Sequence, residues 1–441
     1  MESSVLKQSV EPVPGGAKKR FTVKGLRWWL AGLLMCITVI NYIDRSALGV
    51  AAPIMMKDLD IDLVFYSVWV VGAFQWCYGL SQFFAGRVID WLNIRIGYSV
   101  ALGVWSLAQV LIGISGGKWP LTIFRGLLGV GEAGNFPGAI KTVSQWFPPK
   151  ERTIATGILN IGSGLGSFIA PFLVVWLISR YNWRAAFVVT GCIGFAWIVV
   201  WLLAYRSPDT HPWLSDAERE YIRSGETLLK VADEPEQKGV YKLVLPQKNF
   251  WALAFARFLS EPAWQFFTYF IPIYLTKVRG FSMKQVAWSA AVPFLAADLG
   301  CLFGGFLSPY FIKKGMPVIR ARKLAVTIPA VTMIAAAFIG VVQSAELAVV
   351  FFSIGAFSHQ AISSTLLTLP ADLFPKRTVA TANGMSGTVG YLGGFLFTTS
   401  VGFVALAVGY TPLFVAMGLF DLVGAAILWS FLREPKTEAQ A

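Results

Sequence analysis

Ionisable residues inside long apolar segments are the first feature of this sequence that could do chemistry. Insertion of each such residue at the centre of a membrane helix costs about 2.5–3.5 kcal/mol, so its presence there indicates a specific role. The run Asn41-Tyr42-Ile43-Asp44-Arg45 carries an acid beside a base. Neighbouring residues point about 100° apart on a helix, so the two cannot face one partner. We expect Arg45 to bind a carboxylate and Asp44 to carry a proton; the alternative is a charge pair that fixes this helix to its neighbours.

A second acid and base lie in the glycine-rich stretch RGLLGVGEA, from Arg125 to Ala133. Arg125 and Glu132 are seven residues apart, so they share one helix face, two turns from each other. The glycines around Glu132 allow other helices to approach closely. We expect Glu132 to take up and release a proton, with Arg125 in a gating or structural role. Alternatively, Glu132 is a structural partner of Arg125.

A third group is the stretch RFLSEPAW, in which Arg257 and Glu261 have the i, i+4 spacing of a helical ion pair. Pro262 removes a backbone hydrogen bond at the same place. We expect Arg257 and Trp264 to contact a ligand, and Glu261 to hold Arg257 while the site is empty. The alternative is a static pair that fastens this helix to its neighbours.

Aromatic and amide side chains accompany these charges. Tyr78 and Gln82 form another i, i+4 pair, and Gln265 and Tyr269 follow the third group. Alternating amides and aromatic rings suit a sugar acid, whose hydroxyl groups need hydrogen-bond partners and whose ring carbons need an apolar wall. Each aromatic residue alone is equally consistent with ordinary packing.

Three further ionisable residues lie in the second half of the chain. His359 either lines a pathway or satisfies a contact between helices. Asp298 and Asp421 are interpreted as structural.

A short polar loop contains Gly86, Asp90 and Arg95, which could latch the loop onto a helix end. The sequence contains no phosphate-binding loop, no cluster of metal ligands and no nucleophile elbow. We therefore expect no enzyme activity, no metal and no cofactor, and we expect an ion gradient to supply the energy.

The elements that must position these residues are membrane helices. Of 441 residues, 56% are hydrophobic and only 14% are charged, which excludes an ordinary soluble domain. The four cysteines all lie in apolar runs, as small core residues do. About 20 apolar residues cross a bilayer. Twelve segments qualify: Trp28–Ala51, Val64–Arg87, Gly97–Ser115, Trp119–Thr142, Arg152–Ile178, Ala185–Tyr205, Phe250–Leu275, Gln285–Ile312, Lys323–Val342, Glu346–Leu369, Arg377–Val408 and Pro412–Leu432.

An internal repeat divides these segments into two halves. The motif RTIAT at Arg152–Thr156 recurs as RTVAT at Arg377–Thr381, and a Phe-Pro precedes and glycines follow both copies. Both copies follow an even-numbered segment, so the halves run in parallel. This pattern predicts an all-α membrane protein of two six-helix bundles, related by a pseudo-two-fold axis along the membrane normal.

Basic residues report the orientation of the chain in the membrane. Of 37 Lys and Arg residues, 27 lie on the side of both termini and the central linker, and seven lie on the opposite side. This excess predicts that the termini and the linker are cytoplasmic. It also explains the net charge of +13 without a nucleic-acid partner. The predicted parts are a disordered tail (1–25), the N-terminal bundle (26–205), a linker (206–248), the C-terminal bundle (249–432) and a second tail (433–441).

The linker contains Ser215 followed three residues later by Glu218, the signal of a capping box. We therefore expect a short surface helix there.

These residues resemble the anion:cation symporter family of the major facilitator superfamily, over nearly the whole chain. Its first-helix motif is similar to NYIDR (Asn41–Arg45), and its fourth-helix motif to RGLLGVGEAGNFPG (Arg125–Gly138). Its loop signature is degenerate here, because Asn93 replaces the usual glycine. The nearest likeness is to bacterial hexuronate transporters, carried by RFLSEPAW, ADLGC (Ala297–Cys301), HQA (His359–Ala361) and VATANG (Val379–Gly384).

The resemblance implies a monomeric inner-membrane symporter that takes up glucuronate or galacturonate with protons. It implies that Arg45 contacts the substrate carboxylate, that Asp44 and Glu132 carry protons, and that further pocket residues are Tyr78, Gln82, Ser163 and Thr368. Two alternatives remain open. One is a symporter for an aldonate, an aldarate, tartrate or an aromatic acid. The other is a membrane-embedded sensor that binds a sugar acid without moving it.

Overall fold

The computed structural model describes residues 22–227, 241–374 and 376–434, and all regular secondary structure in those residues is helical. The predicted tails therefore lie almost entirely outside the described residues. The first bundle begins with a long helix that carries Asp44 and Arg45. Its elements are α1 (Leu26–Asp58), α2 (Leu63–Phe65), the π-helix η1 (Tyr66–Val71), α3 (Gly72–Leu92), α4 (Ile94–Gly113), α5 (Lys118–Glu132), α6 (Asn135–Trp146), α7 (Pro149–Arg180) and α8 (Trp183–Ala204).

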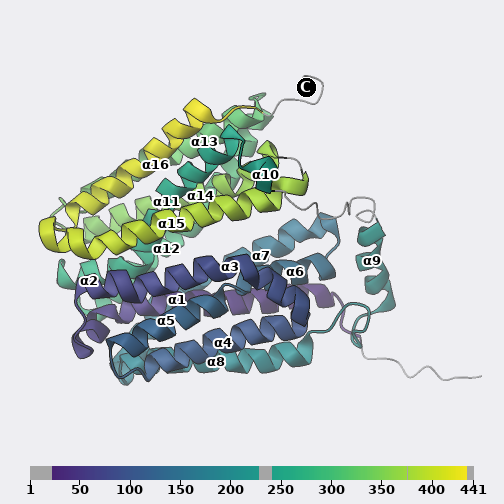
Figure 1. Cartoon of the computed structure of the whole chain (residues 1–441), viewed down its shortest axis with the longest axis horizontal. Helices are drawn as coiled ribbons and strands as arrows, with labels where there is room; N and C mark the ends of the chain where they lie inside the picture. The colour runs from purple at the N-terminus through teal and green to yellow at the C-terminus, as the bar shows by residue number, and fades with distance from the viewer. Residues whose placement is uncertain (1–21, 228–240, 375, 435–441) are drawn as a thin grey trace, which may run out of the picture.

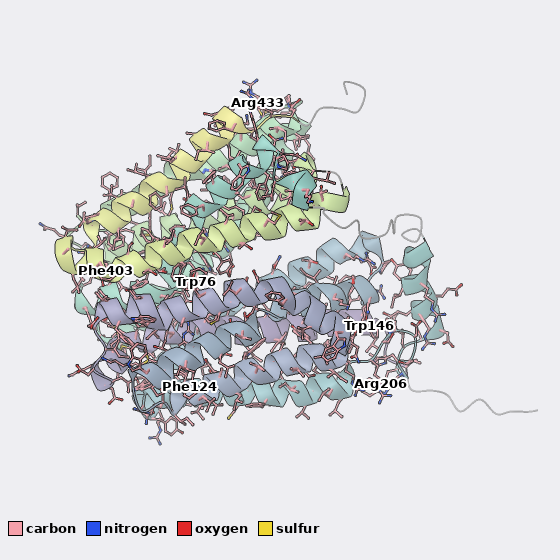
Figure 2. All side chains as sticks on the ribbon, viewed as in Figure 1. Trp76, Phe124, Trp146, Arg206, Phe403 and Arg433 are labelled. Carbon is pink, nitrogen blue, oxygen red and sulfur yellow. The ribbon has the colours of Figure 1, made fainter. Side chains whose placement is uncertain are left out.

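The second bundle follows two short helices of the linker, α9 (Asp216–Thr227) and α10 (Tyr241–Val244). Its elements are α11 (Lys248–Lys277), α12 (Met283–Lys313), α13 (Val318–Met333), the 3-10 helix η2 (Ile334–Phe338), α14 (Ala345–Leu373), α15 (Lys376–Val408) and α16 (Thr411–Phe431). Figure 1 shows the two bundles side by side, with α9 at one end of the molecule. We call this end the linker end and the opposite one the far end. Arg206 and Arg433 lie toward the linker end, and Phe403 lies toward the far end (Figure 2).

The bundles touch through the middle and far-end parts of their helices. Gln75 of α3 donates a hydrogen bond to Gln265 of α11 (3.2 Å) and accepts one from Thr398 of α15 (2.9 Å). The Tyr66 hydroxyl group donates to the Tyr269 carbonyl oxygen (3.3 Å). The ribbons of the two bundles diverge toward the linker end (Figure 1). The structure is therefore one in which the bundles are closed on each other at the far end.

Ten helices of the described residues are long and apolar enough to cross a membrane, whereas the sequence predicted twelve spans. The fourth predicted span is divided between α5 and α6 at Ala133 and Gly134, so neither piece is long enough. The seventh, α11, is 30 residues long but carries two prolines and polar residues such as Glu261 and Gln265, which lower its hydropathy. Both segments still occupy the places of spans in the two bundles (Figure 1).

The predicted linker helix is present as α9, but its capping box is only half formed. Ser215 accepts a hydrogen bond from the Glu218 backbone N–H (3.3 Å). The Glu218 carboxylate instead binds Arg27 (2.6 Å) and the backbone N–H of Leu26 (3.3 Å), at the start of α1. Arg27 also binds Glu151 (2.8 Å), which lowers the pKa of the Glu151 carboxyl group. These contacts tie α9 to the first bundle.

A glycine of α15 lies against α11 at the place where a proline interrupts the backbone hydrogen bonds of α11. Pro262 has no N–H group, so the carbonyl oxygen of Phe258, four residues earlier, lacks its helical partner. Gly393 of α15 lies against this carbonyl group, and a methyl group added to Gly393 would stand 2.1 Å from its oxygen. The glycine therefore allows two helices that carry candidate site residues to pack backbone against backbone.

Replacing Gly393 by alanine should destabilise the second bundle by about 1–3 kcal/mol, because the methyl group meets backbone that cannot rotate away. Gly384→Ala is the matched control, since Gly384 lies on the same helix with nothing within 4 Å of the added methyl group. Thermal unfolding of the purified proteins checks this. Equal melting temperatures for the two variants would contradict the packing described here.

Candidate functional site

A buried ion pair joins the first and fourth predicted spans. The Arg45 Nε atom of α1 lies 2.5 Å from the Glu132 Oε2 atom of α5, and both side chains are at least nine-tenths buried. The contact uses one atom of each group. Arg45 Nη2 and Glu132 Oε1 have no hydrogen-bond partner among the described residues. Arg45 is therefore held in place and still has a free donor for a further carboxylate.

Glu132 thus pairs with a residue that helix spacing alone did not select. The alternative prediction gave it Arg125, two turns away on α5. The Arg125 side chain is fully buried, and its three nitrogen atoms have no hydrogen-bond partner among the described residues. Its guanidinium group lies over the ring of Phe74 (4.6 Å) and near that of Tyr269 (5.9 Å). Arg125 adds a second positive charge behind the Arg45–Glu132 pair without forming a salt bridge in this state.

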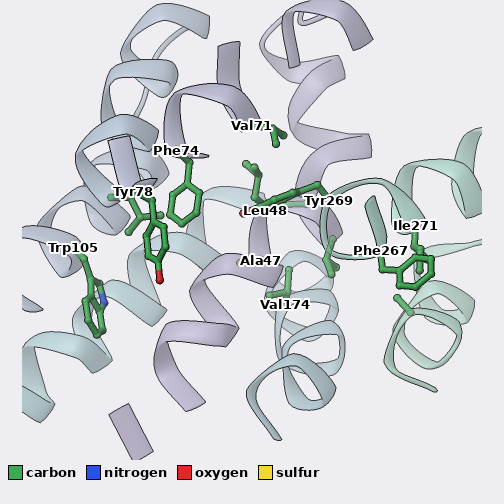
Figure 3. Close-up of a cluster of buried hydrophobic side chains, with 14 of the residues drawn as sticks. Ala47, Leu48, Val71, Phe74, Tyr78, Trp105, Val174, Phe267, Tyr269 and Ile271 are labelled. Carbon is green, nitrogen blue, oxygen red and sulfur yellow. The ribbon is translucent and has the colours of Figure 1, made fainter. Parts of the chain in front are cut away.

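Aromatic rings surround Arg45. Its guanidinium carbon lies 4.5 Å from the centre of the Tyr78 ring and 5.4 Å from those of Phe74 and Tyr42. Figure 3 shows Phe74 and Tyr78 next to each other on α3. Gln82 donates a hydrogen bond to the Tyr78 hydroxyl group (3.1 Å), which confirms the predicted i, i+4 contact. Such rings attract a cation from their faces and offer apolar walls to a ligand.

The sequence analysis missed Tyr391, which completes this wall from the second bundle. Its ring centre is 5.2 Å from that of Tyr78, across the boundary between the bundles. Tyr391 is the one tyrosine of α15 and lies between Gly390 and Gly393. A tyrosine within a run of glycines in a membrane span could have indicated a site residue. Tyr391 and Tyr78 place one face of Arg45 at the junction of the two bundles.

Asp44 points away from Arg45, as the angle of about 100° between neighbouring helix positions predicts. Its carboxyl group lies inside the first bundle among Trp105 and Gln109 of α4 and Thr190 of α8. Gln109 donates to Thr190 (3.1 Å). Neither Asp44 oxygen has a partner of normal hydrogen-bond geometry among the described residues. Asp44 therefore occupies a separate polar group, one helix face away from the Arg45 site.

Arg257 and Glu261 are both half-buried in α11, but the direct pair predicted from their spacing is absent from the salt bridges of the described residues. Arg257 donates to the Asn383 side chain (2.9 Å) and backbone carbonyl (3.0 Å) and to Ser386 (3.1 Å), all on α15. Glu261 accepts from Gln265 (3.2 Å). The prediction that Glu261 holds Arg257 in the empty site is therefore wrong for this state, because α15 provides better-placed acceptors.

Glu261 nevertheless belongs to the charged centre of the molecule. Both Arg257 on its own helix and Arg45 of the first bundle attract its carboxylate. Three arginines (Arg45, Arg125 and Arg257) and two glutamates (Glu132 and Glu261) thus contribute to this centre. One positive charge is in excess when both carboxyl groups are ionised, which matches one carboxylate ligand.

The remaining predicted pocket residues are dispersed. Trp264 stacks on His359 inside the second bundle, with ring centres 5.8 Å apart. Ser163 of α7 and Thr368 of α14 are partly exposed, and each donates to a carbonyl oxygen of its own helix. The structure shows no contact of either one with Arg45. They remain predictions that depend on how the bundles move.

The predicted loop latch is described only in part. The side chains of Gly86 and Asp90 lie outside the described residues. Arg95 donates to the Leu202 carbonyl oxygen of α8, so it fastens α4 to a neighbouring helix. Asn93 has a φ angle of 62°. The family that this chain resembles usually has glycine at this position. Glycine adopts such angles freely, which explains the family preference, and asparagine tolerates them better than most residues.

Comparison with known proteins identifies relatives over most of the chain. The family model described as Major Facilitator Superfamily matches residues 34–398. A hexuronate transporter of Escherichia coli (strain K12) is 39% identical over 412 residues, 93% of this chain and 95% of the relative. A galacturonate transporter of Dickeya chrysanthemi is 38% identical over 330 residues, 75% of this chain and 95% of the relative.

A solved structure has the same fold at low sequence identity. It is that of a bacterial homolog of the human lysosomal transporter Spinster, in an inward-facing and unoccupied conformation. It matches with a TM-score of 0.74 and 19% identity, over 94% of this chain and 100% of that chain.

Proposed function

This chain belongs to the major facilitator superfamily, and we propose that it takes up a hexuronate, glucuronate or galacturonate, together with protons. Membership confirms the predicted fold class and the prediction of a multi-pass membrane transporter rather than an enzyme. The names of the relatives support a sugar acid anion as the substrate. The substrate itself, the coupling to protons and the roles of individual residues are the parts we propose.

The observation that carries the proposal is the arrangement around Arg45. Its guanidinium group is anchored by one contact to Glu132 and keeps an unpartnered Nη2 atom. A carboxylate could accept two parallel hydrogen bonds from this fork, which is the strongest contact that arginine makes with such a group. Tyr78 and Tyr391 offer ring faces to the carbons of a sugar. The amide oxygen of Gln82, whose nitrogen donates to Tyr78, is available for a hydroxyl group, whereas Gln265 is bound to Gln75 and Glu261.

Competition for Arg45 explains why protons would accompany the anion. Arg45 and Glu132 form a buried ion pair, and an entering carboxylate would place a second acid on the same guanidinium group. Two carboxylates that share a buried site disfavour each other's ionisation. Uptake of one proton by Glu132 removes this cost and releases Arg45 from its partner. Asp44, in its separate polar group, is a second proton carrier in the proposal.

Transport then requires the site to open alternately to the two ends. The bundles are closed at the far end, so substrate would leave at the linker end. The excess of Lys and Arg supports a cytoplasmic linker end in a bacterial inner membrane. Opening at the far end would break the contacts of Gln75 with Gln265 and Thr398.

The test is uptake of labelled glucuronate into proteoliposomes, with competition by a panel of unlabelled acids. The proposal expects saturable accumulation that glucuronate and galacturonate inhibit most strongly. Stronger inhibition by an aldonate, an aldarate, tartrate or an aromatic acid would assign another substrate. Saturable binding without net uptake would identify a sensor instead.

A further inference from the structure

The amide side chain of Gln75 joins the two bundles at two points. Its nitrogen atom donates to the amide oxygen of Gln265 on α11 (3.2 Å), and its oxygen atom accepts from the hydroxyl group of Thr398 on α15 (2.9 Å). Gln75, Gln265 and Thr398 are 3%, 6% and 0% exposed. One residue of the first bundle therefore binds two different helices of the second bundle in the interior of the molecule.

Gln265 extends these contacts to the charged centre. Its nitrogen atom donates to the carboxylate of Glu261, one turn earlier on α11 (3.2 Å). A carboxylate only accepts hydrogen bonds, so an ionised Glu261 directs the Gln265 nitrogen toward itself and the Gln265 oxygen toward Gln75. Gln75 must then turn its nitrogen to Gln265 and its oxygen to Thr398. We call Thr398, Gln75, Gln265 and Glu261 the inter-bundle chain.

The contact between Gln75 and Thr398 lies on the far-end side of the aromatic wall beside Arg45. Tyr78 is about one turn after Gln75 on α3, and its ring faces Tyr391 of α15 (5.2 Å). On α15, Thr398 is seven residues nearer than Tyr391 to Phe403, which lies toward the far end (Figure 2). The inter-bundle chain therefore crosses the boundary between the candidate site and the far end.

The surroundings of this contact are closely packed. The rings of Trp76 and Phe395, one from each bundle, have their centres 4.9 Å apart. Gly402 of α15 lies against α2, where an added methyl group would stand 2.7 Å from the Val64 Cα atom. The polar groups of Gln75, Gln265 and Thr398 thus satisfy one another in a place that is closed to solvent.

Such a polar contact favours closure and still permits opening. When the bundles separate at the far end, water can replace each lost partner, and the Thr398 hydroxyl group keeps the Gly394 carbonyl oxygen of its own helix (2.9 Å). The net gain from each hydrogen bond between the bundles is therefore modest. An apolar residue in place of Gln75 would leave the Gln265 oxygen without a donor only in the closed form, which is costly.

We propose that Gln75 holds the far end closed while the site is open at the linker end, and that the inter-bundle chain ties this closure to Glu261 in the charged centre. This inference rests on the alternate opening of the two ends in the proposed function. Gln75 is a positioning residue in this role, because it acts on the ratio of the open and closed forms and does not bind substrate. A residue that only stabilises one bundle would leave this ratio unchanged.

The test is the distance between two spin labels at the far end, measured in lipid by double electron–electron resonance without substrate. The labels are attached to cysteines that replace Lys57, at the end of α1, and Val408, at the end of α15, in a chain whose four native cysteines are changed to serine. Both positions are exposed. Gln75→Leu should raise the ratio of the open to the closed form about 10-fold or more, because it removes both hydrogen bonds between the bundles.

Variants of Thr398 keep the proposal testable if Gln75→Leu does not fold. Thr398→Val removes the hydroxyl group at nearly constant volume and should also lengthen the distance, whereas Thr398→Ser keeps a hydroxyl group and should not. Ser358→Ala is the matched control, since it removes a buried hydroxyl group whose partner, Thr332, lies in the same bundle (2.7 Å). A longer distance in Gln75→Leu and Thr398→Val, with unchanged distances in Thr398→Ser and Ser358→Ala, supports the proposal.

Two results would overturn it. One is an unchanged distance in whichever of Gln75→Leu and Thr398→Val folds, even with a lower melting temperature. The other is an equal lengthening in Ser358→Ala, since the loss of any buried hydrogen bond would then open the far end. The measurement requires no substrate, so its result does not depend on glucuronate uptake. Failure of uptake together with a positive far-end response would contradict the proposed function alone.

Discussion

Replacing Arg45 by lysine should weaken substrate binding about 10- to 100-fold, although the charge is kept. Each hydrogen bond to a charged group contributes roughly 1.5–3 kcal/mol, and lysine cannot reproduce the planar fork of arginine. The lysine ammonium group would also have to serve both Glu132 and the substrate from one point. Arg45→Ala should bind substrate no more tightly than Arg45→Lys, because it also leaves the buried Glu132 carboxylate without its partner.

Calorimetry on the purified proteins measures this directly. Arg184→Lys is the matched control, because Arg184 pairs with Asp58 in an exposed place (2.6 Å) and is remote from the site. Exposed ion pairs contribute little to stability, so this control should fold and bind substrate normally. Near-normal affinity in Arg45→Ala would remove Arg45 from the substrate site.

The second large effect is expected for Glu132→Gln. Glutamine keeps an oxygen that can accept the hydrogen bond from Arg45, so the geometry should survive while the exchangeable proton is lost. Substrate binding and exchange of substrate across the membrane should continue. Accumulation against a gradient should disappear, because the site can no longer return without its proton.

Counterflow and concentrative uptake in the same proteoliposomes separate these two activities. Glu346→Gln serves as the control, since Glu346 is exposed at the start of α14 and binds only its neighbour Ser344 among the described contacts (2.8 Å). If Glu132→Gln still concentrates substrate, the coupling proton belongs to another group, and Asp44 is the next candidate.

Hydropathy and the internal repeat predicted the helical fold well. A run of about 20 apolar residues has few alternatives to a membrane helix, and ten of the twelve predicted spans meet that standard in the described residues. The division of the fourth span at Ala133 and Gly134 was not predicted. Gly134 packs tightly against α4 at this division, where an added methyl group would stand 2.6 Å from the side chain of Ala101.

The pairing partners of the charged residues were not predicted. Helix spacing reports which residues share a face, and it suggested Arg125 for Glu132 and Glu261 for Arg257. The partners in the structure come from other helices: Arg45, 87 residues before Glu132, and Asn383, 126 residues after Arg257. Spacing along one helix contains no information about such contacts, because they depend on how the bundles pack.

Proton movement that depends on substrate is the measurement that tests the central claim most directly. Proteoliposomes would contain a pH-sensitive dye, with the membrane potential held at zero, and would receive glucuronate or galacturonate from outside. The account predicts that the lumen becomes acidic as substrate enters, at a rate that saturates with substrate and falls strongly in Arg45→Lys. Saturable uptake of either acid without any change in internal pH would contradict it.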